Sequence, residues 1–249
     1  MKYTVQEGSH SVADAVALCR PEVIASYPIT PQTHIVERLA ALIAEGKLDA
    51  EFLNTKSHLS SLSIVAGSTA SGIRSYTATS SQGLVSMCEL LHAVSGMRLP
   101  VVMTVANRAL SAPLNIWNDH SDSMSQRDTS WIQLYAETVQ EAVDLHIQAY
   151  RLAESEKVML PVMVCIDGYS LTHSYQPVEL PAHHDVEKFL PPFNPEEKLI
   201  TENPVTMGAY ATPDDYMEFK YEQQKAMESA LKEIKWKKWK SLKLTILMK

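Results

Sequence analysis

Three short polar segments each follow a run of residues that favours a β-strand, and their side chains suit an anionic ligand. They are 27–33 (YPITPQT), 77–83 (TATSSQG) and 106–109 (ANRA), the last continuing to 115–122 (NIWNDHSD). Thr30 precedes a predicted helix N-terminus, which stabilises negative charge, and Arg108 can hold a carboxylate through two parallel hydrogen bonds. Each segment alone is also explained by helix capping and surface charge. Together, at equivalent strand ends, they favour a ligand site.

The elements around these segments alternate as βαβ units do. Short β-rich runs predict strands at 23–27, 51–54, 74–78, 101–105 and 162–166. Helical periodicity predicts helices at 58–71, 83–95 and 137–156, and another that begins at Pro31 with Thr30 as its cap. We therefore predict an α/β fold, a doubly wound parallel sheet with helices on both faces.

The chain changes character after Tyr175, where seven prolines punctuate the segment up to residue 213. No single regular element can span so many prolines. We predict a domain over 1–176, an extended proline-rich arm over 177–213, and a helix with a lysine-rich tail over 214–249.

Charge and composition exclude several classes of protein. The net charge is −7, but residues 232–249 carry seven lysines against one acid (+6), so residues 1–231 carry −13. An acidic body argues against nucleic acid as a partner. No stretch reaches the roughly 18 apolar residues of a membrane helix, and no signal-peptide core follows the N-terminus. We therefore expect a cytoplasmic protein that contacts no membrane.

Other catalytic motifs are incomplete. Gly67 and Gly72 have P-loop spacing, but Ile73 and Arg74 stand where Lys and Ser or Thr are needed. No G-x-S-x-G elbow supports a serine hydrolase. The nine histidines and three cysteines include no pair at metal-ligand spacing, so we predict no metal site. The isolated cysteines (Cys19, Cys88 and Cys165) indicate buried thiols and cannot supply a four-cysteine iron–sulfur site.

Taken jointly, the three polar segments, Asp167-Gly168 and Asp214-Asp215-Tyr216 resemble the α subunit of the 2-oxoacid:ferredoxin oxidoreductases, above all the pyruvate enzymes. The resemblance covers roughly residues 1–231 and implies a thiamine-diphosphate pyrimidine-binding, transketolase-like domain. It implies that a β subunit shares the cofactor and holds the Mg²⁺. It further implies γ and δ subunits, iron–sulfur clusters and coenzyme A in the complex, with ferredoxin and pyruvate as partners.

The resemblance also assigns roles to individual residues. Thr30 and Arg108 are implied to hold the 2-oxoacid carboxylate. The cofactor-binding positions implied are Pro28, Ile29, His58, Ser81, Gln82 and Gly83. In this family the thiazolium ylide attacks the keto carbon, carbon dioxide leaves, electrons pass singly to the clusters, and coenzyme A collects the acyl group. The carbanion chemistry is the cofactor's, and the protein supplies orientation and electrostatics.

The chain departs from the family pattern at residue 58. Members usually read V-E-S-E-H-S-A where residues 55–61 read TKSHLSS. The second glutamate, which hydrogen-bonds the pyrimidine ring and promotes its imino tautomer, falls on His58. A neutral imidazole is a weak substitute, and an imidazolium opposes ring protonation. Glu51 and Glu89 are the other candidate acids.

A second departure is that the family's next α/β domain does not follow residue 235, so the lysine-rich end is read as a frameshifted or truncated product. A basic amphipathic helix that touches a membrane or a partner is the alternative. We expect the chain alone to be inactive. The main hypothesis is a subunit that acts in pyruvate oxidation. The alternatives are a branched-chain oxoacid or 2-oxoglutarate as substrate, and a truncated, non-catalytic interaction module.

Overall fold

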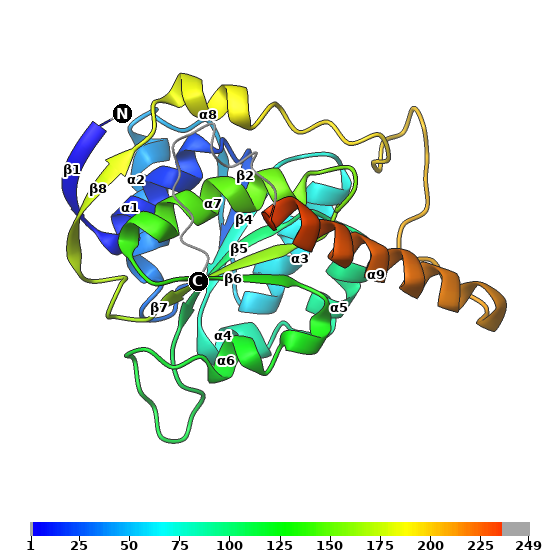
Figure 1. Cartoon of the computed structure of the whole chain (residues 1–249), viewed down its shortest axis with the longest axis horizontal. Coiled ribbons are helices and arrows are strands. Elements are labelled where there is room, and N and C mark those ends of the chain that lie inside the picture. Colours follow the sequence, from blue (N-terminus) through cyan, green and yellow to red (C-terminus); the bar gives the residue numbers. More distant parts are fainter. Residues whose placement is uncertain (1, 236–249) are drawn as a thin grey trace.

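A six-stranded parallel sheet forms the centre of the computed structural model, which describes residues 2–235 (Figure 1). Its order is β3-β2-β4-β5-β7-β6. The strands are β2 (Val23–Ser26), β3 (Glu51–Asn54), β4 (Ser75–Thr79), β5 (Val102–Asn107), β6 (Ile132–Ala136) and β7 (Val162–Asp167). Five of them were predicted to within two residues, and the α/β fold class is confirmed. The prediction missed β6.

Successive residues of the central strands face opposite sides of the sheet, so each strand contributes to two cores. Val102 and Val162 pack with α1 (Gly8–Leu18), α2 (Thr33–Ala44) and α7 (Val139–Ala153). Their neighbours Met103 and Met163 pack with α3 (His58–Ala70), α4 (Ser81–Val85) and α5 (Cys88–Gly96) on the other face. The sheet is therefore covered by helices on both faces, as predicted.

Two predicted helices differ in detail. The helix expected over 83–95 is divided into α4 and α5, with Ser86 and Met87 between them. The helix expected from Pro31 begins at Thr33, and its N-cap is Gln32 rather than Thr30. The Thr30–Pro31 peptide bond is cis.

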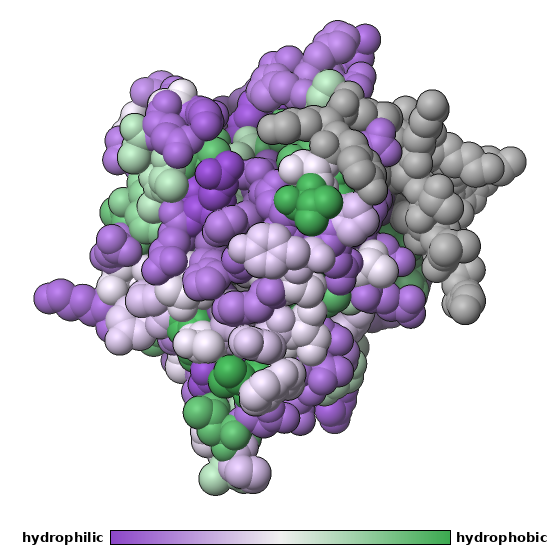
Figure 2. Space-filling model, turned by 90° about the vertical axis from the view of Figure 1, so that its left-hand side faces the viewer, coloured by the Kyte–Doolittle hydropathy of each residue, from purple (hydrophilic) through white to green (hydrophobic). Residues whose placement is uncertain are grey.

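A second, two-stranded sheet lies beside the main one. β1 (Lys2–Glu7) pairs antiparallel with β8 (Tyr175–Leu180), so the two ends of the predicted domain meet. The predicted boundary at residue 176 falls inside β8, and α8 (His183–Phe189) lies in the segment expected to be an arm. In Figure 2, which views the molecule from this side, the face is mainly hydrophilic with small hydrophobic patches.

The segment after α8 runs without helix or strand to α9 (Pro213–Lys235). Arg74 fixes the start of this segment: its guanidinium donates to the carbonyls of Cys19 (2.9 Å) and Pro191 (2.7 Å) and to both oxygens of Glu154. On α9, Ala226 and Ala230 are buried against the core that includes α7. The apolar side chains used to predict this helix are instead mostly exposed, at Tyr216, Phe219 and Leu231.

Among the described residues, no helix is both long and apolar enough to cross a membrane. Two short helical elements lie between β5 and β6: α6 (Ser121–Met124) and a 3-10 turn at Arg127–Thr129. The predictions about the lysine-rich tail concern residues that lie largely outside the described ones, since 236–249 are not described.

Candidate functional site

The three polar segments meet at the carboxyl edge of the main sheet, through the side chain of Arg108. Its Nη1 donates to the backbone carbonyl of Thr30 at 2.6 Å, and its Nη2 donates to Oε1 of Gln82 at 3.1 Å. Thr30 follows β2, Gln82 follows β4, and Arg108 follows β5. Because β2, β4 and β5 are neighbouring parallel strands, their following loops lie side by side. The prediction that these segments converge is consistent with this geometry.

The segment after β4 is held by serine hydroxyls and an unusual backbone. Ser80 Oγ donates to the carbonyl of Ala106 at 2.6 Å. Ser81 has a φ of 46°, and its Oγ lies 2.6 Å from both the carbonyl of Ala109 and Oε1 of Gln82. A non-glycine residue in the left-handed region is uncommon and persists only where its surroundings fix it. The β4 and β5 loops therefore form one hydrogen-bonded unit.

Asp122 is the acid that joins these two loops. Its fully buried carboxylate accepts hydrogen bonds from the amides of Ser81 (2.9 Å) and Arg108 (3.2 Å) and from Nδ2 of Asn107 (2.7 Å). Burial raises the pKa of Asp122, and the hydrogen bonds from Asn107 and the amides oppose that rise. The sequence placed Asp122 in a polar segment, but its hydrogen bonds to backbone amides leave no pattern in the sequence.

Gln32 fixes the Tyr27–Thr33 segment from within. Its side chain is buried, and Nε2 donates to Oγ of Ser26 and to the carbonyl of Ala78, both at 2.9 Å. Its Oε1 accepts from the amide of Ile29 at 3.3 Å. Sequence reasoning emphasised the prolines of this segment and missed the glutamine that attaches it to β2 and β4.

The residues implied to touch substrate or cofactor differ in exposure. Pro28 and Thr30 are exposed, Ile29, Gln82 and Arg108 are partly buried, and Ser81 and Gly83 are buried. Burial lowers the pKa of Arg108, and Asp122 opposes that shift, so the guanidinium stays protonated near neutral pH. Nε of Arg108 is buried and has no hydrogen-bond partner among the described residues. The site therefore holds a fixed positive charge.

His58 begins α3 and lies against the β4 loop. Its Nδ1 is 3.1 Å from Oγ1 of Thr79, and its ring meets that of Tyr27 edge-on with centroids 5.1 Å apart. A Cβ added to Gly83 would lie 2.7 Å from Nε2 of His58, so this ring needs a glycine there. Burial, followed by the charge of Arg108, lowers the pKa of His58 to about 4. The imidazole is therefore neutral at pH 7.

The two other candidate acids, Glu51 and Glu89, are placed differently from His58. Glu51 is the first residue of β3, at the amino end of the strand, whereas the site lies at the carboxyl ends. Glu89 is exposed in the first turn of α5. His58 stays the residue that the resemblance places at the position of the usual glutamate, and its role stays a prediction.

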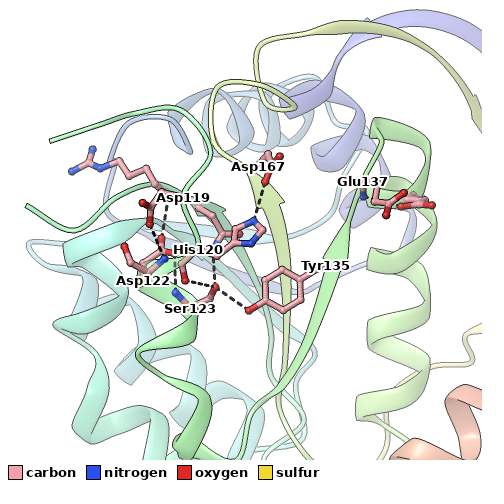
Figure 3. Close-up of polar contacts among 11 residues, drawn as sticks. Asp119, His120, Asp122, Ser123, Tyr135, Glu137 and Asp167 are labelled. Atoms are coloured by element: carbon pink, nitrogen blue, oxygen red, sulfur yellow. Dashed lines mark hydrogen bonds and ion pairs between the residues drawn. The ribbon is translucent and has the colours of Figure 1, made fainter. Parts of the chain in front are cut away.

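A second polar group flanks Asp122 (Figure 3). His120 Nε2 lies 2.9 Å from Oδ1 of Asp167, and its ring centroid is 5.1 Å from that of Tyr135. The Tyr135 hydroxyl lies 3.1 Å from Oγ of Ser123, the residue after Asp122. These contacts connect Asp167, the last residue of β7, to the start of α6, the short helix that contains Asp122.

Comparison with known proteins assigns the family. A family model described as "Pyruvate flavodoxin/ferredoxin oxidoreductase, thiamine diP-bdg" matches residues 14–237. The chain belongs to this family. The resemblance and the thiamine-diphosphate-binding fold expected from the sequence are thereby confirmed.

The relatives of this chain are longer proteins. Pyruvate synthase subunit PorA of Methanosarcina barkeri is 53% identical over 234 residues, which cover 94% of this chain and 58% of that protein. The corresponding subunit of Methanocaldococcus jannaschii is 51% identical over 229 residues, 92% of this chain and 59% of that protein. Ketoisovalerate oxidoreductase subunit VorA of Pyrococcus horikoshii is 44% identical over 232 residues, 93% of this chain and 58% of that protein. The chain thus spans less than two thirds of the length of these relatives.

A solved structure agrees with this family fold. The 2-oxoglutarate:ferredoxin oxidoreductase of Magnetococcus marinus, with 2-oxoglutarate, coenzyme A and succinyl-CoA bound, matches with a TM-score of 0.78 at 21% identity. The match covers 94% of this chain and 46% of that chain. At this identity the likeness supports the fold alone.

Proposed function

We propose that this chain supplies the pyrimidine-binding and carboxylate-binding half of a thiamine-diphosphate site in a pyruvate:ferredoxin oxidoreductase. The observation that carries the proposal is the guanidinium of Arg108, which joins the Thr30 and Gln82 loops at one point. A planar guanidinium is the side chain best suited to a carboxylate, which it binds through two parallel bonds.

Arg108 binds and orients the 2-oxoacid. Its Nη1 currently donates to the Thr30 carbonyl, an uncharged acceptor that a carboxylate would displace because hydrogen bonds between charged groups are stronger. The Thr30 residue is exposed at this point, so its hydroxyl is available to the same carboxylate. Asp122 holds the Arg108 backbone and so fixes the direction from which the guanidinium approaches.

The residues present also fit the pyrimidine side of thiamine diphosphate. Gly83 lets the ring of His58 lie directly against the β4 loop, since a Cβ there would be 2.7 Å from Nε2 of His58. Nδ1 of His58 is engaged by Thr79, which leaves Nε2 for a bound heterocycle. When bound, the cofactor supplies the carbanion that cleaves the 2-oxoacid. A neutral imidazole offers a hydrogen bond but no negative charge, so His58 orients the ring more effectively than it promotes proton transfer.

The remaining components belong to the same proposal. We assign the diphosphate and its Mg²⁺ to a β subunit, and the iron–sulfur clusters and coenzyme A to the rest of a complex with γ and δ subunits. The complex acts in the cytoplasm and passes electrons to ferredoxin. The three cysteines of this chain are free, and burial raises the pKa of Cys165 to about 12 and that of Cys19 further, so both stay protonated.

Two alternatives have specific support. The 44% identity to a ketoisovalerate subunit leaves a branched-chain oxoacid as a second candidate substrate. The histidine at position 58, where the resemblance implies a glutamate, leaves a non-catalytic interaction module as the other candidate.

Reconstitution tests these possibilities together. The chain is co-expressed with cognate β, γ and δ subunits, and viologen reduction is measured with coenzyme A and pyruvate, 3-methyl-2-oxobutanoate or 2-oxoglutarate. A His58→Glu variant is assayed beside it. Greatest kcat/KM for pyruvate supports the proposal, whereas preference for another oxoacid replaces the substrate. Co-purification without activity in either form supports the interaction module, and rescue by His58→Glu locates the defect at the cofactor ring.

A further inference from the structure

Glu7, His34 and His173 converge on one point outside the Arg108 site. Oε1 of Glu7 lies 2.7 Å from Nδ1 of His34, and the rings of His34 and His173 have centroids 4.7 Å apart. One ligand-type atom from each of the three residues lies within 4.8 Å of the others. Since ligands bound to one cation at about 2.1 Å lie at most about 4.2 Å apart, a small side-chain rotation closes the set.

The three residues come from different parts of the chain. Glu7 ends β1, His34 lies in the first turn of α2, and His173 precedes β8. Because each segment contributes one ligand, no spacing motif exists in the sequence, and the expectation of no metal site rested on spacing alone. The geometry of these three side chains departs from that expectation.

The surroundings of the cluster orient its ligands. Nδ1 of His173 lies 2.8 Å from Oγ1 of the buried Thr172, which leaves Nε2 for a cation. The ring of Tyr169 stacks on His173 with centroids 4.9 Å apart, and the carbonyl of Thr172 accepts from Ser9 Oγ at 2.8 Å. A hydrogen bond to the second nitrogen of a histidine and a fixed ring plane are typical supports of a metal ligand.

The charges of the cluster also suit a cation. Glu7 is only 6% exposed, and its carboxylate has a histidine ring nitrogen as its partner. His10 lies near the cluster, with its ring centroid 6.3 Å from that of His34.

We propose that Glu7, His34 and His173 bind one divalent transition-metal cation of the zinc class. Two imidazoles and one carboxylate form a three-ligand set that such cations accept, with a fourth position for water. The cation would connect the β1–β8 sheet to α2, the helix that follows the Thr30 segment. Its role is structural, and it is independent of thiamine diphosphate.

Binding of Co²⁺ to the metal-free full chain tests the site. We expect one equivalent of Co²⁺ to give a visible ligand-field absorption that Zn²⁺ abolishes. His34→Ala and His173→Ala should each weaken the affinity at least about tenfold, as loss of one ligand does. His34 is the safer variant for folding, since its side chain is 40% exposed.

The matched control is His183→Ala. His183 is an exposed histidine whose Nδ1 lies 3.5 Å from Glu187, so it represents an ordinary surface pair. Its variant should bind Co²⁺ as the parent chain does. Absorption that survives in a His34→Ala/His173→Ala double variant, or that His183→Ala abolishes, would overturn the proposal.

Thermal unfolding gives a second readout. Zn²⁺ at a hundredfold excess over the Kd of the parent chain should raise the Tm of that chain by about 5–11 °C, and should raise the Tm of His34→Ala by about half as much or less. Equal shifts in both proteins would mean that zinc binds elsewhere, and the proposal would fail.

Discussion

Arg108 donates from Nη1 to the backbone carbonyl of Thr30 across 2.6 Å, although the two residues are 78 positions apart. The contact joins the loop that follows β2 to the loop that follows β5, at the carboxyl edge of the sheet. A lysine in place of Arg108 would keep the charge but could not reach the Thr30 carbonyl and Gln82 together.

Arg108→Lys should therefore lower kcat/KM for pyruvate in the reconstituted complex by roughly 10- to 100-fold, mostly through KM. Steady-state viologen reduction measures this change. Arg127→Lys, at an exposed arginine whose partner is Asp128, is the matched control and should leave both constants unchanged. Equal kinetics in the two variants would remove Arg108 from the substrate site.

Asp122→Asn should destabilise the chain by about 1–3 kcal/mol. The amide group keeps one acceptor but turns a donor toward the Ser81 and Arg108 amides, so a buried hydrogen bond is lost. Urea unfolding followed by circular dichroism measures the change. Asp128→Asn, at a carboxylate with 83% exposure, should shift the midpoint little. A midpoint for Asp122→Asn as high as that of the control would show that the carboxylate does not hold the loops.

Gly83→Ala should cost about 1–3 kcal/mol because the new Cβ would lie 2.5 Å from Oγ1 of Thr79 and 2.7 Å from Nε2 of His58. Gly96→Ala is the contrast: nothing lies within 4 Å of its added Cβ, and Gly96 still lies within α5, where alanine has the higher helix propensity. In a double-mutant cycle, the cost of Gly83→Ala should fall in a His58→Ala background. Additive costs would contradict the contact between residues 58 and 83.

Acid should destabilise the chain partly through His58. Its pKa falls from 6.5 to about 4 on folding, so the unfolded chain binds the extra proton between these values. The stability from the neutral ring is complete above pH 6.5 and is lost as the pH falls toward 4, by up to about 3 kcal/mol. His58→Gln removes the titrating imidazole. The difference in unfolding free energy between parent and variant should therefore change between pH 6.5 and pH 4. A constant difference would mean that the ring is not desolvated. Comparison with the parent is needed because His146 also has its pKa lowered to about 4.

The sequence was most informative where a local pattern decides the structure. β-branched runs such as Val162–Asp167 mark strands buried on both faces, and the parallel order of β2, β4 and β5 brings their loops together. β6 was missed because its run of five residues is short and is interrupted by the polar Gln133. β1 was missed because its partner strand, β8, lies far away in the sequence.

The site was less predictable than the sheet. Gln32 and Asp122 act on backbone groups of other segments, which no motif encodes. The Glu7–His34–His173 cluster forms only when three separate segments fold together, so its residues show no metal-ligand spacing in the sequence. The assignment of Thr30 and Arg108 to the 2-oxoacid carboxylate came from the resemblance, and it stays a prediction until the reconstituted complex is assayed.

The pairing of β1 with β8 has a consequence for how the chain is made. Lys2–Glu7 is synthesised before the strands of the main sheet, but its partner strand begins only at Tyr175. At roughly 5–20 residues per second, β1 waits roughly 10–30 s without a partner, while the main sheet can start to assemble behind it. Of the described strands, the earliest in the chain is thus among the last to pair, and its pairing requires that every strand of the main sheet has already been synthesised.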